Sequence, residues 1–276
     1  MNALEIHGLT KRRGDFVLRG LELTLPAGCI MGLIGENGAG KSTTIRLILN
    51  ALSRDGGTIA VYGKDNRAMT ALDREDIGVV LDEVGLPEYM NAQQIGRMMA
   101  GIFTRWQPEV YAGYLRRLAL PEDKPFRDFS RGMKMKQGLA VALSHQPKLL
   151  LLDEATSGLD PVVRDEILTI FSDFTRDEEH AVLLSSHIVS DLEKICDYIA
   201  FLHKGRLLLC EEKDRLTEAY GILRGGAEDI DPAAVCGRHT TPYGTEYLVR
   251  RDAVPVGMAL GQVNIEDLFV FMAKEV

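Results

Sequence analysis

The residues from 35 to 43 have the composition of a phosphate-binding loop. They match the pattern G-x-x-x-x-G-K-[ST] and are Gly35, Glu36, Asn37, Gly38, Ala39, Gly40, Lys41, Ser42 and Thr43. Glycines let backbone N–H groups turn inward, where a side chain would collide with a phosphate. The pattern predicts that Lys41 contacts the β- and γ-phosphates and that the Ser42 hydroxyl is a ligand for Mg²⁺. The loop therefore predicts a nucleoside triphosphate site.

Two adjacent carboxylates, Asp153 and Glu154, follow the apolar run 149–152. Asp153 predicts a Mg²⁺ ligand, directly or through water, and Glu154 can polarise an attacking water. An apolar run that ends in Asp-Glu usually means only that a strand reaches solvent. The next residues, ATSGLDP from 155 to 161, make the catalytic interpretation specific.

A second phosphate site is predicted just upstream, in Phe129-Ser130-Arg131-Gly132-Met133. Taken alone, Ser130 predicts only the N-cap of a helix. A helix start with a serine hydroxyl and exposed N–H groups can also bind an anion. The position close before Asp153 favours the second interpretation.

Four short apolar runs predict the strands that position these residues, at 29–34, 77–81, 149–152 and 181–185. Polar residues follow each run, at Gly35, Asp82, Asp153 and Ser186-His187. The carboxyl ends of parallel strands line one edge of a sheet, and ligands bind at that edge. The pattern predicts an α/β fold with a mostly parallel sheet and the site at this edge.

The remaining segments complete the predicted architecture. Residues 3–28 alternate like antiparallel strands broken at Gly14 and Gly20, and 58–62 predicts a further strand of this kind. Residues 90–120 predict helices, with Ile95, Met98, Met99 and Ile102 on one face. Residues 221–245 are glycine- and turn-rich, and a strand and a helix are expected at 247–250 and 265–273.

Composition limits the classes of function. A net charge of −8 argues against a nucleic-acid binder with a broad basic surface. No apolar run approaches the roughly 18 residues that span a bilayer. The first residues, MNALEIHGLTKRRGDF, lack an apolar signal region, so we expect the chain in the cytoplasm.

These motifs resemble the ATP-binding subunit of an ABC transporter, over roughly residues 3–215. The resemblance makes 35–43 the Walker A loop, Asp153 the end of Walker B and Glu154 the catalytic base. It places the D-loop at 157–161, with Asp160, and makes His187 the switch histidine at the γ-phosphate. The signature, usually LSGGQ, appears as FSRGM, and FSRGMKMKQGLAVAL is similar to type-2 ABC exporters, which include exporters of antimicrobial or toxic peptides.

The resemblance implies a P-loop NTPase core at 1–215, with an antiparallel β subdomain and a helical signature subdomain at about 86–146. Residues 216–276 would form a small C-terminal α+β extension. It also implies a head-to-tail homodimer that uses ATP and Mg²⁺. Each ATP would lie between the Walker A loop of one copy and residues Ser130, Arg131, Gly132 and Met133 of the other. Closure would drive separate transmembrane permease subunits at the cytoplasmic face of the cell membrane.

Two positions depart from the family pattern. Arg13 stands where members carry an adenine-stacking aromatic residue, so either the Arg13 guanidinium or the nearby Phe16 is expected to hold adenine. Asp82 stands where the Q-loop glutamine is expected and is predicted to contact Mg²⁺. Two alternatives stay open: a soluble ABC-type ATPase that acts on nucleic acid or ribosomes, and a nucleotide-binding scaffold without turnover.

Overall fold

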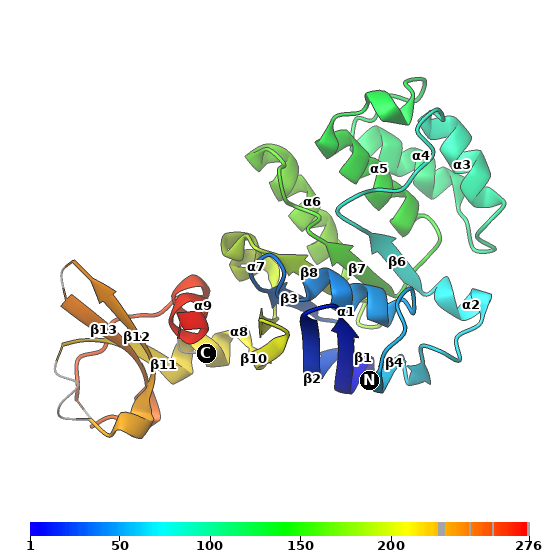
Figure 1. Cartoon of the computed structure of the whole chain (residues 1–276). Helices are drawn as coiled ribbons and strands as arrows, with labels where there is room; N and C mark the ends of the chain where they lie inside the picture. The colour runs from blue at the N-terminus through cyan, green and yellow to red at the C-terminus, as the bar shows by residue number, and fades with distance from the viewer. Residues whose placement is uncertain (226–229, 243, 256, 275–276) are drawn as a thin grey trace.

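A six-stranded sheet forms the centre of the computed structural model, which describes residues 1–225, 230–242, 244–255 and 257–274 (Figure 1). The strand order is β10-β9-β3-β8-β7-β6. The strands are β3 (Ile30–Ile34), β6 (Ile77–Val80), β7 (Leu149–Asp153), β8 (Ala181–Ser186), β9 (Tyr198–His203) and β10 (Arg206–Glu212). The pairs β6–β7, β7–β8, β8–β3 and β3–β9 are parallel, and β10 is antiparallel to β9. The four predicted parallel strands are confirmed.

An antiparallel sheet in the order β2-β1-β4-β5 lies against the central one. Its strands are β1 (Asn2–Arg13), β2 (Phe16–Pro26), β4 (Gly56–Val61) and β5 (Lys64–Asp65). The predicted break at Gly14 is confirmed, because β1 and β2 turn there. The predicted break at Gly20 is wrong, because β2 continues through it. Gly20 has a φ of 61° and lies at a shift of register between β1 and β2, so it forms a bulge within the strand.

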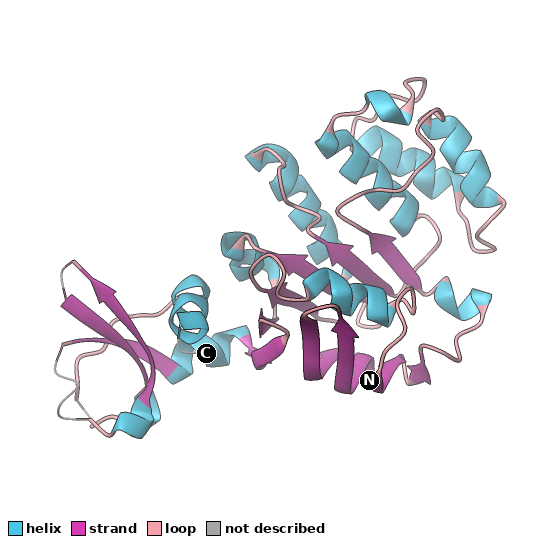
Figure 2. Cartoon of the chain, viewed as in Figure 1, coloured by secondary structure: helices cyan, strands magenta, loops and turns pink. Residues whose placement is uncertain are grey.

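Helices α3 (Ala92–Ala100), α4 (Pro108–Arg117) and α5 (Arg131–Leu143), with the short η1 (Phe126–Asp128), form the helical part at the upper right of Figures 1 and 2. Methionines and aromatic residues of this part, Met90, Met98, Met99, Phe103 and Trp106, pack in or against the hydrophobic core. The predicted place of Ile102 on the same helix face as Ile95, Met98 and Met99 is wrong, and its side chain is 61% exposed. Helix α3 ends at Ala100 with Gly101 as its C-cap, so helical periodicity no longer applies at Ile102.

Two hydrophobic cores cover the two faces of the central sheet. Alternate residues of β7 face opposite sides, so that Leu149 and Leu151 enter one core and Leu150 and Leu152 enter the other. The first core contains α1 (Lys41–Ile48) and the antiparallel sheet. The second contains the helical part, α6 (Pro161–Phe174) and α7 (Val189–Ile195). A short helix, α2 (Ala71–Arg74), precedes β6.

The C-terminal residues form a three-stranded sheet in the order β11-β13-β12 with two helices. The elements are α8 (Lys213–Ala219), β11 (Tyr220–Arg224), η3 (Pro232–Ala234), β12 (Val235–Thr241), β13 (Gly244–Arg250), η4 (Arg251–Ala253) and α9 (Ile265–Lys274). The expected strand and final helix are confirmed. Strand β12 and most of β11 lie inside the glycine- and turn-rich stretch 221–245, where no strand was predicted. The predicted division at residue 215 falls inside α8, and the separateness of 216–276 stays a prediction.

Across the described ranges, no helix combines the length and apolar character needed to cross a bilayer.

Candidate nucleotide-binding site

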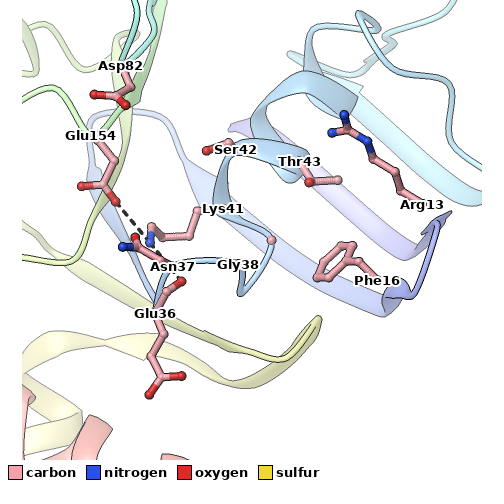
Figure 3. Close-up of a pocket in the computed structure, with 11 residues that line it drawn as sticks. Arg13, Phe16, Glu36, Asn37, Gly38, Lys41, Ser42, Thr43, Asp82 and Glu154 are labelled. Carbon is pink, nitrogen blue, oxygen red and sulfur yellow. Dashed lines mark hydrogen bonds and ion pairs between the residues drawn. The ribbon is translucent and has the colours of Figure 1, made fainter.

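A pocket of about 350 Å³ opens where β3 and β7 end (Figure 3). Figure 3 shows Asp82 and Glu154 on one side of the loop after β3, and Arg13 and Phe16 on the other. The lining residues are Arg13, Phe16, Glu36, Asn37, Gly38, Gly40, Lys41, Ser42, Thr43, Asp82 and Glu154. The fold therefore brings together residues from four distant segments, each of which the sequence proposed for the site.

The loop turns directly into helix α1, which begins at Lys41. Gly40 has a φ of 115°, and a Cβ atom there would lie 2.7 Å from Cζ of Phe16, so only glycine fits. Gly35 and Ala39 are buried and do not line the pocket. The carboxylate of Glu36 points away from Lys41 in Figure 3. The loop thus presents its backbone and Lys41 to the pocket.

Lys41 is held from two sides. Its Nζ donates a 2.6 Å hydrogen bond to the Gly35 carbonyl oxygen and lies 3.1 Å from Oε1 of Glu154. The Lys41 side chain is 5% exposed and that of Glu154 is 13% exposed. A charge removed from water to this degree is costly unless it is paired. The ammonium at the floor of the pocket is therefore already neutralised by the predicted catalytic base.

Glu154 also contacts His187, whose Nδ1 lies 2.7 Å from Oε2 of the carboxylate. His187 does not line the pocket and reaches it through Glu154. Glu154 has a φ of 53°, in the left-handed region, which costs a non-glycine residue about 1–3 kcal/mol. Its backbone N–H is bonded to the Ser185 carbonyl oxygen at 3.1 Å. The strand end thus fixes the carboxylate between Lys41 and His187.

Asp153 is 3% exposed and accepts a 2.6 Å hydrogen bond from the Ser185 hydroxyl. Ser185 was not proposed for the site. The sequence offers a signal for it, since Ser185 is the next-to-last residue of β8 and pairs with Asp153 in the parallel register. The Asp153 carboxylate and the Ser42 hydroxyl offer oxygen donors, which Mg²⁺ prefers. The chemistry of this donor pair fits the ion.

The predicted second phosphate site lies outside the pocket. Ser130 is the N-cap of α5, as predicted, and its hydroxyl accepts a 3.2 Å hydrogen bond from the Met133 N–H. Gly132 lies near Leu159 of the predicted D-loop. Asp160 caps α6 and accepts hydrogen bonds from the N–H groups at 162 and 163.

Arg131 and Asp82 form an ion pair, with 2.6 Å between a guanidinium nitrogen and Oδ1. The sequence assigned Arg131 to the ATP of another copy and Asp82 to a metal of its own. Within one chain the structure joins the two side chains, and both predicted roles stay predictions.

Comparison with known proteins gives consistent matches. Residues 18–157 match the family described as ABC transporter. The chain is 28% identical over 276 residues to the bacitracin transport ATP-binding protein BcrA of Enterococcus faecalis, covering 95% of this chain and 87% of that protein. It is 36% identical over 213 residues to the Nod factor export ATP-binding protein I of Rhizobium sp. (strain N33), covering 75% and 69%. A solved ATP binding subunit of an ABC transporter superposes with a TM-score of 0.69 at 26% identity, covering 78% of this chain and 91% of that one.

Proposed function

We propose that this chain, which belongs to the ABC transporter family, is the ATP-hydrolysing subunit of an exporter. The family and the α/β cassette fold that the motifs predicted are confirmed. The chain is therefore an ABC-type ATPase. Export is proposed because the segment after Ser130 resembles the exporter branch, and because a relative is named for export.

The observation that carries the catalytic proposal is the line of contacts from Lys41 through Glu154 to His187. It lies beside a phosphate-binding loop at the edge where β3, β7 and β8 end. A chain that only bound nucleotide would need the loop but not a carboxylate held between a lysine and a histidine.

The residues divide the work of ATP hydrolysis. Lys41 and the loop N–H groups bind the phosphates, and ATP takes over the role of Glu154 as the anionic partner of Lys41. Glu154, once released from Lys41, accepts the proton of the attacking water, and His187 holds the carboxylate in place through its Nδ1 contact. Bound Mg²⁺, held by Ser42 and Asp153, would add electrostatic stabilisation of the phosphate charge.

The dimer and the membrane partners belong to the same proposal. Ser130 and its neighbours lie outside the pocket of their own chain, so a second copy, facing head to tail, is needed to bring them to an ATP. Separate permease subunits would hold the pair at the cytoplasmic face of the membrane and choose the cargo. The alternative of an ATPase that acts on nucleic acid or ribosomes receives no support from the relatives compared above.

ATP hydrolysis by the full chain, with and without Glu154→Gln, tests the proposal. The amide cannot accept the proton, so we expect turnover to fall by at least about 10²-fold while ATP binding persists. Size-exclusion chromatography should then show an ATP-dependent dimer. Glu246→Gln is the matched control, because Glu246 pairs with Arg224 on the C-terminal sheet, away from the pocket. A Glu154→Gln variant that hydrolyses ATP at the parental rate would show that Glu154 is not the catalytic base.

A further inference from the structure

The ion pair between Asp82 and Arg131 joins two parts of the chain that serve different nucleotides in the proposed dimer. Asp82 lines the pocket for the chain's own ATP. Arg131 is the first residue of α5, the helix that would face the ATP on the other copy. The 2.6 Å contact therefore links both sites of the dimer through one chain.

The guanidinium of Arg131 lies beside Gly158 of the predicted D-loop. A Cβ atom at Gly158 would lie 3.3–3.4 Å from three of the guanidinium atoms. Gly158 has a φ of 70°, which glycine adopts without strain. The guanidinium thus lies between the Asp82 carboxylate and Gly158 of the predicted D-loop.

Arg131 occupies an electrostatically unfavourable place. The N-terminus of a helix carries partial positive charge, which favours acids and disfavours cations. The first turn of α5 contains no acidic residue. Asp82, which is 49 residues away in sequence, supplies the counter-charge from another element. The Arg131 guanidinium at the start of α5 can bind an incoming anion once its ion pair with Asp82 is broken.

The ion pair between Asp82 and Arg131 is weak enough for a phosphate to replace the carboxylate. Its side chains are 53% and 50% exposed, and ion pairs in water contribute little to stability. A triphosphate carries more charge than one carboxylate, and a guanidinium can bind phosphate with two parallel hydrogen bonds.

We propose that Asp82 is a positioning residue that holds Arg131 against the D-loop until the dimer closes. On closure, Arg131 exchanges the Asp82 carboxylate for the terminal phosphate of the ATP on the other copy. This inference rests on the proposed homodimer. The two residues of the ion pair are therefore expected to have opposite effects on dimer closure: Asp82 opposes closure and Arg131 favours it.

The test measures the MgATP concentration that gives half-maximal dimer, by size-exclusion chromatography with light scattering. All variants are made in the full chain with Glu154→Gln, at one protein concentration. Asp82→Asn should lower this concentration by about two- to fivefold, the range that an exposed ion pair accounts for. Arg131→Gln should raise it by about tenfold, because a charged contact to phosphate is lost. The double variant should behave like Arg131→Gln, since Asp82 acts through Arg131.

The pair Arg117–Asp173 provides the matched control. Its atoms are 3.2 Å apart, its side chains are 44% and 34% exposed, and neither residue lines the pocket. Arg117→Gln and Asp173→Asn should leave the half-maximal concentration unchanged. A shift in the same direction for Asp82→Asn and Arg131→Gln would show a merely structural pair and overturn the inference alone. Absence of an ATP-dependent dimer in the Glu154→Gln chain itself would overturn the proposed homodimer, and the inference with it.

Discussion

Lys41 and Glu154 are opposite charges that lie almost out of contact with water, so each depends on the other for compensation. An arriving triphosphate competes with Glu154 for the ammonium. In the proposed mechanism, binding of ATP and release of the Glu154 carboxylate from Lys41 would therefore occur together.

Replacing Lys41 should affect stability as well as binding. Lys41→Ala removes the charge that faces the phosphates, so ATP affinity should fall. It also leaves the Glu154 carboxylate without its cation, and we expect a loss of about 1–3 kcal/mol in the free energy of unfolding, less than for a fully buried pair. Lys41→Ala with Glu154→Gln should recover part of that loss. Urea unfolding and a fluorescent-nucleotide titration measure the two effects; equal stability of the single and double variants would contradict the coupling.

Adenine recognition can be separated from phosphate recognition. Arg13 and Phe16 are paired across the β1–β2 hairpin, and both line the pocket. Arg13→Ala with Phe16→Ala should weaken ATP binding by about 1–3 kcal/mol, the range for stacking of a base on a side chain. Binding of inorganic triphosphate, which has no base, should not change. Competition against a fluorescent nucleotide compares the two ligands; an equal loss for both would mean that the pair shapes the loop instead.

The motif residues could be predicted from the sequence because their chemistry is local. A glycine-rich loop followed by lysine and serine has few other uses, and its flanking strand and helix can be seen in the same stretch. The partner of Asp82 could not be predicted in this way. The charge of Asp82 suggested a metal, whereas its contact with Arg131 depends on how α5 is placed beside the end of β6.

Elements were predictable where hydrophobic patterns repeat and polar residues mark their ends. The four inner strands are continuous apolar runs, which is typical of parallel strands buried on both faces. β9 and β10 carry no motif at their ends, and they were not assigned. β11 and β12 lie among glycines and turn residues, where local composition favours loops, and only pairing with β13 makes them strands.

Glu75 connects elements that no sequence pattern predicts to be in contact. It follows α2, and its carboxylate accepts hydrogen bonds from the Thr104 N–H and hydroxyl, both at 2.8 Å, and from the Arg105 N–H at 3.0 Å. Burial alone would raise the pKa of Glu75, but these hydrogen bonds outweigh it and lower the pKa to about 2. The ionised carboxylate thus holds the connection between α3 and α4 against the start of β6.

Stability should therefore depend on the charge of Glu75. Glu75→Gln should cost about 1–3 kcal/mol at pH 7, because the donors lose an ionised acceptor. The pKa of Glu75 is lower in the folded than in the unfolded chain, so this contribution is complete above the ordinary value of 4.5 and declines as the pH falls toward 2. Urea midpoints across this range compare the variant with the parent, and Glu88→Gln on the surface is the control. A constant difference down to pH 2 would contradict the assignment.

At the scale of the whole molecule, α9 ties the C-terminal sheet to the ATPase core. Leu268 is fully buried and belongs to the same hydrophobic core as α6 and α7. Phe269 contacts Phe201 of β9, with ring centroids 5.4 Å apart, and the Ile265 N–H donates to Glu193 of α7 at 2.7 Å. Figure 1 shows α9 between the three-stranded sheet and α7. These contacts predict that the extension and the core unfold together.

The single tryptophan makes this joint unfolding measurable. Trp106 lies in the connection between α3 and α4, and Figure 1 shows these two helices on the far side of the central sheet from α9. Leu268→Ala removes a fully buried side chain, so we expect a loss of about 2–5 kcal/mol and a lower urea midpoint in Trp106 fluorescence. Leu223→Ala is the control, because Leu223 belongs to a separate small cluster in the extension and should shift the midpoint less. An unchanged Trp106 midpoint, with an earlier loss of circular dichroism, would mean that the extension unfolds alone. A shared midpoint would mean that α9 transmits the stability of the C-terminal residues to the helical part.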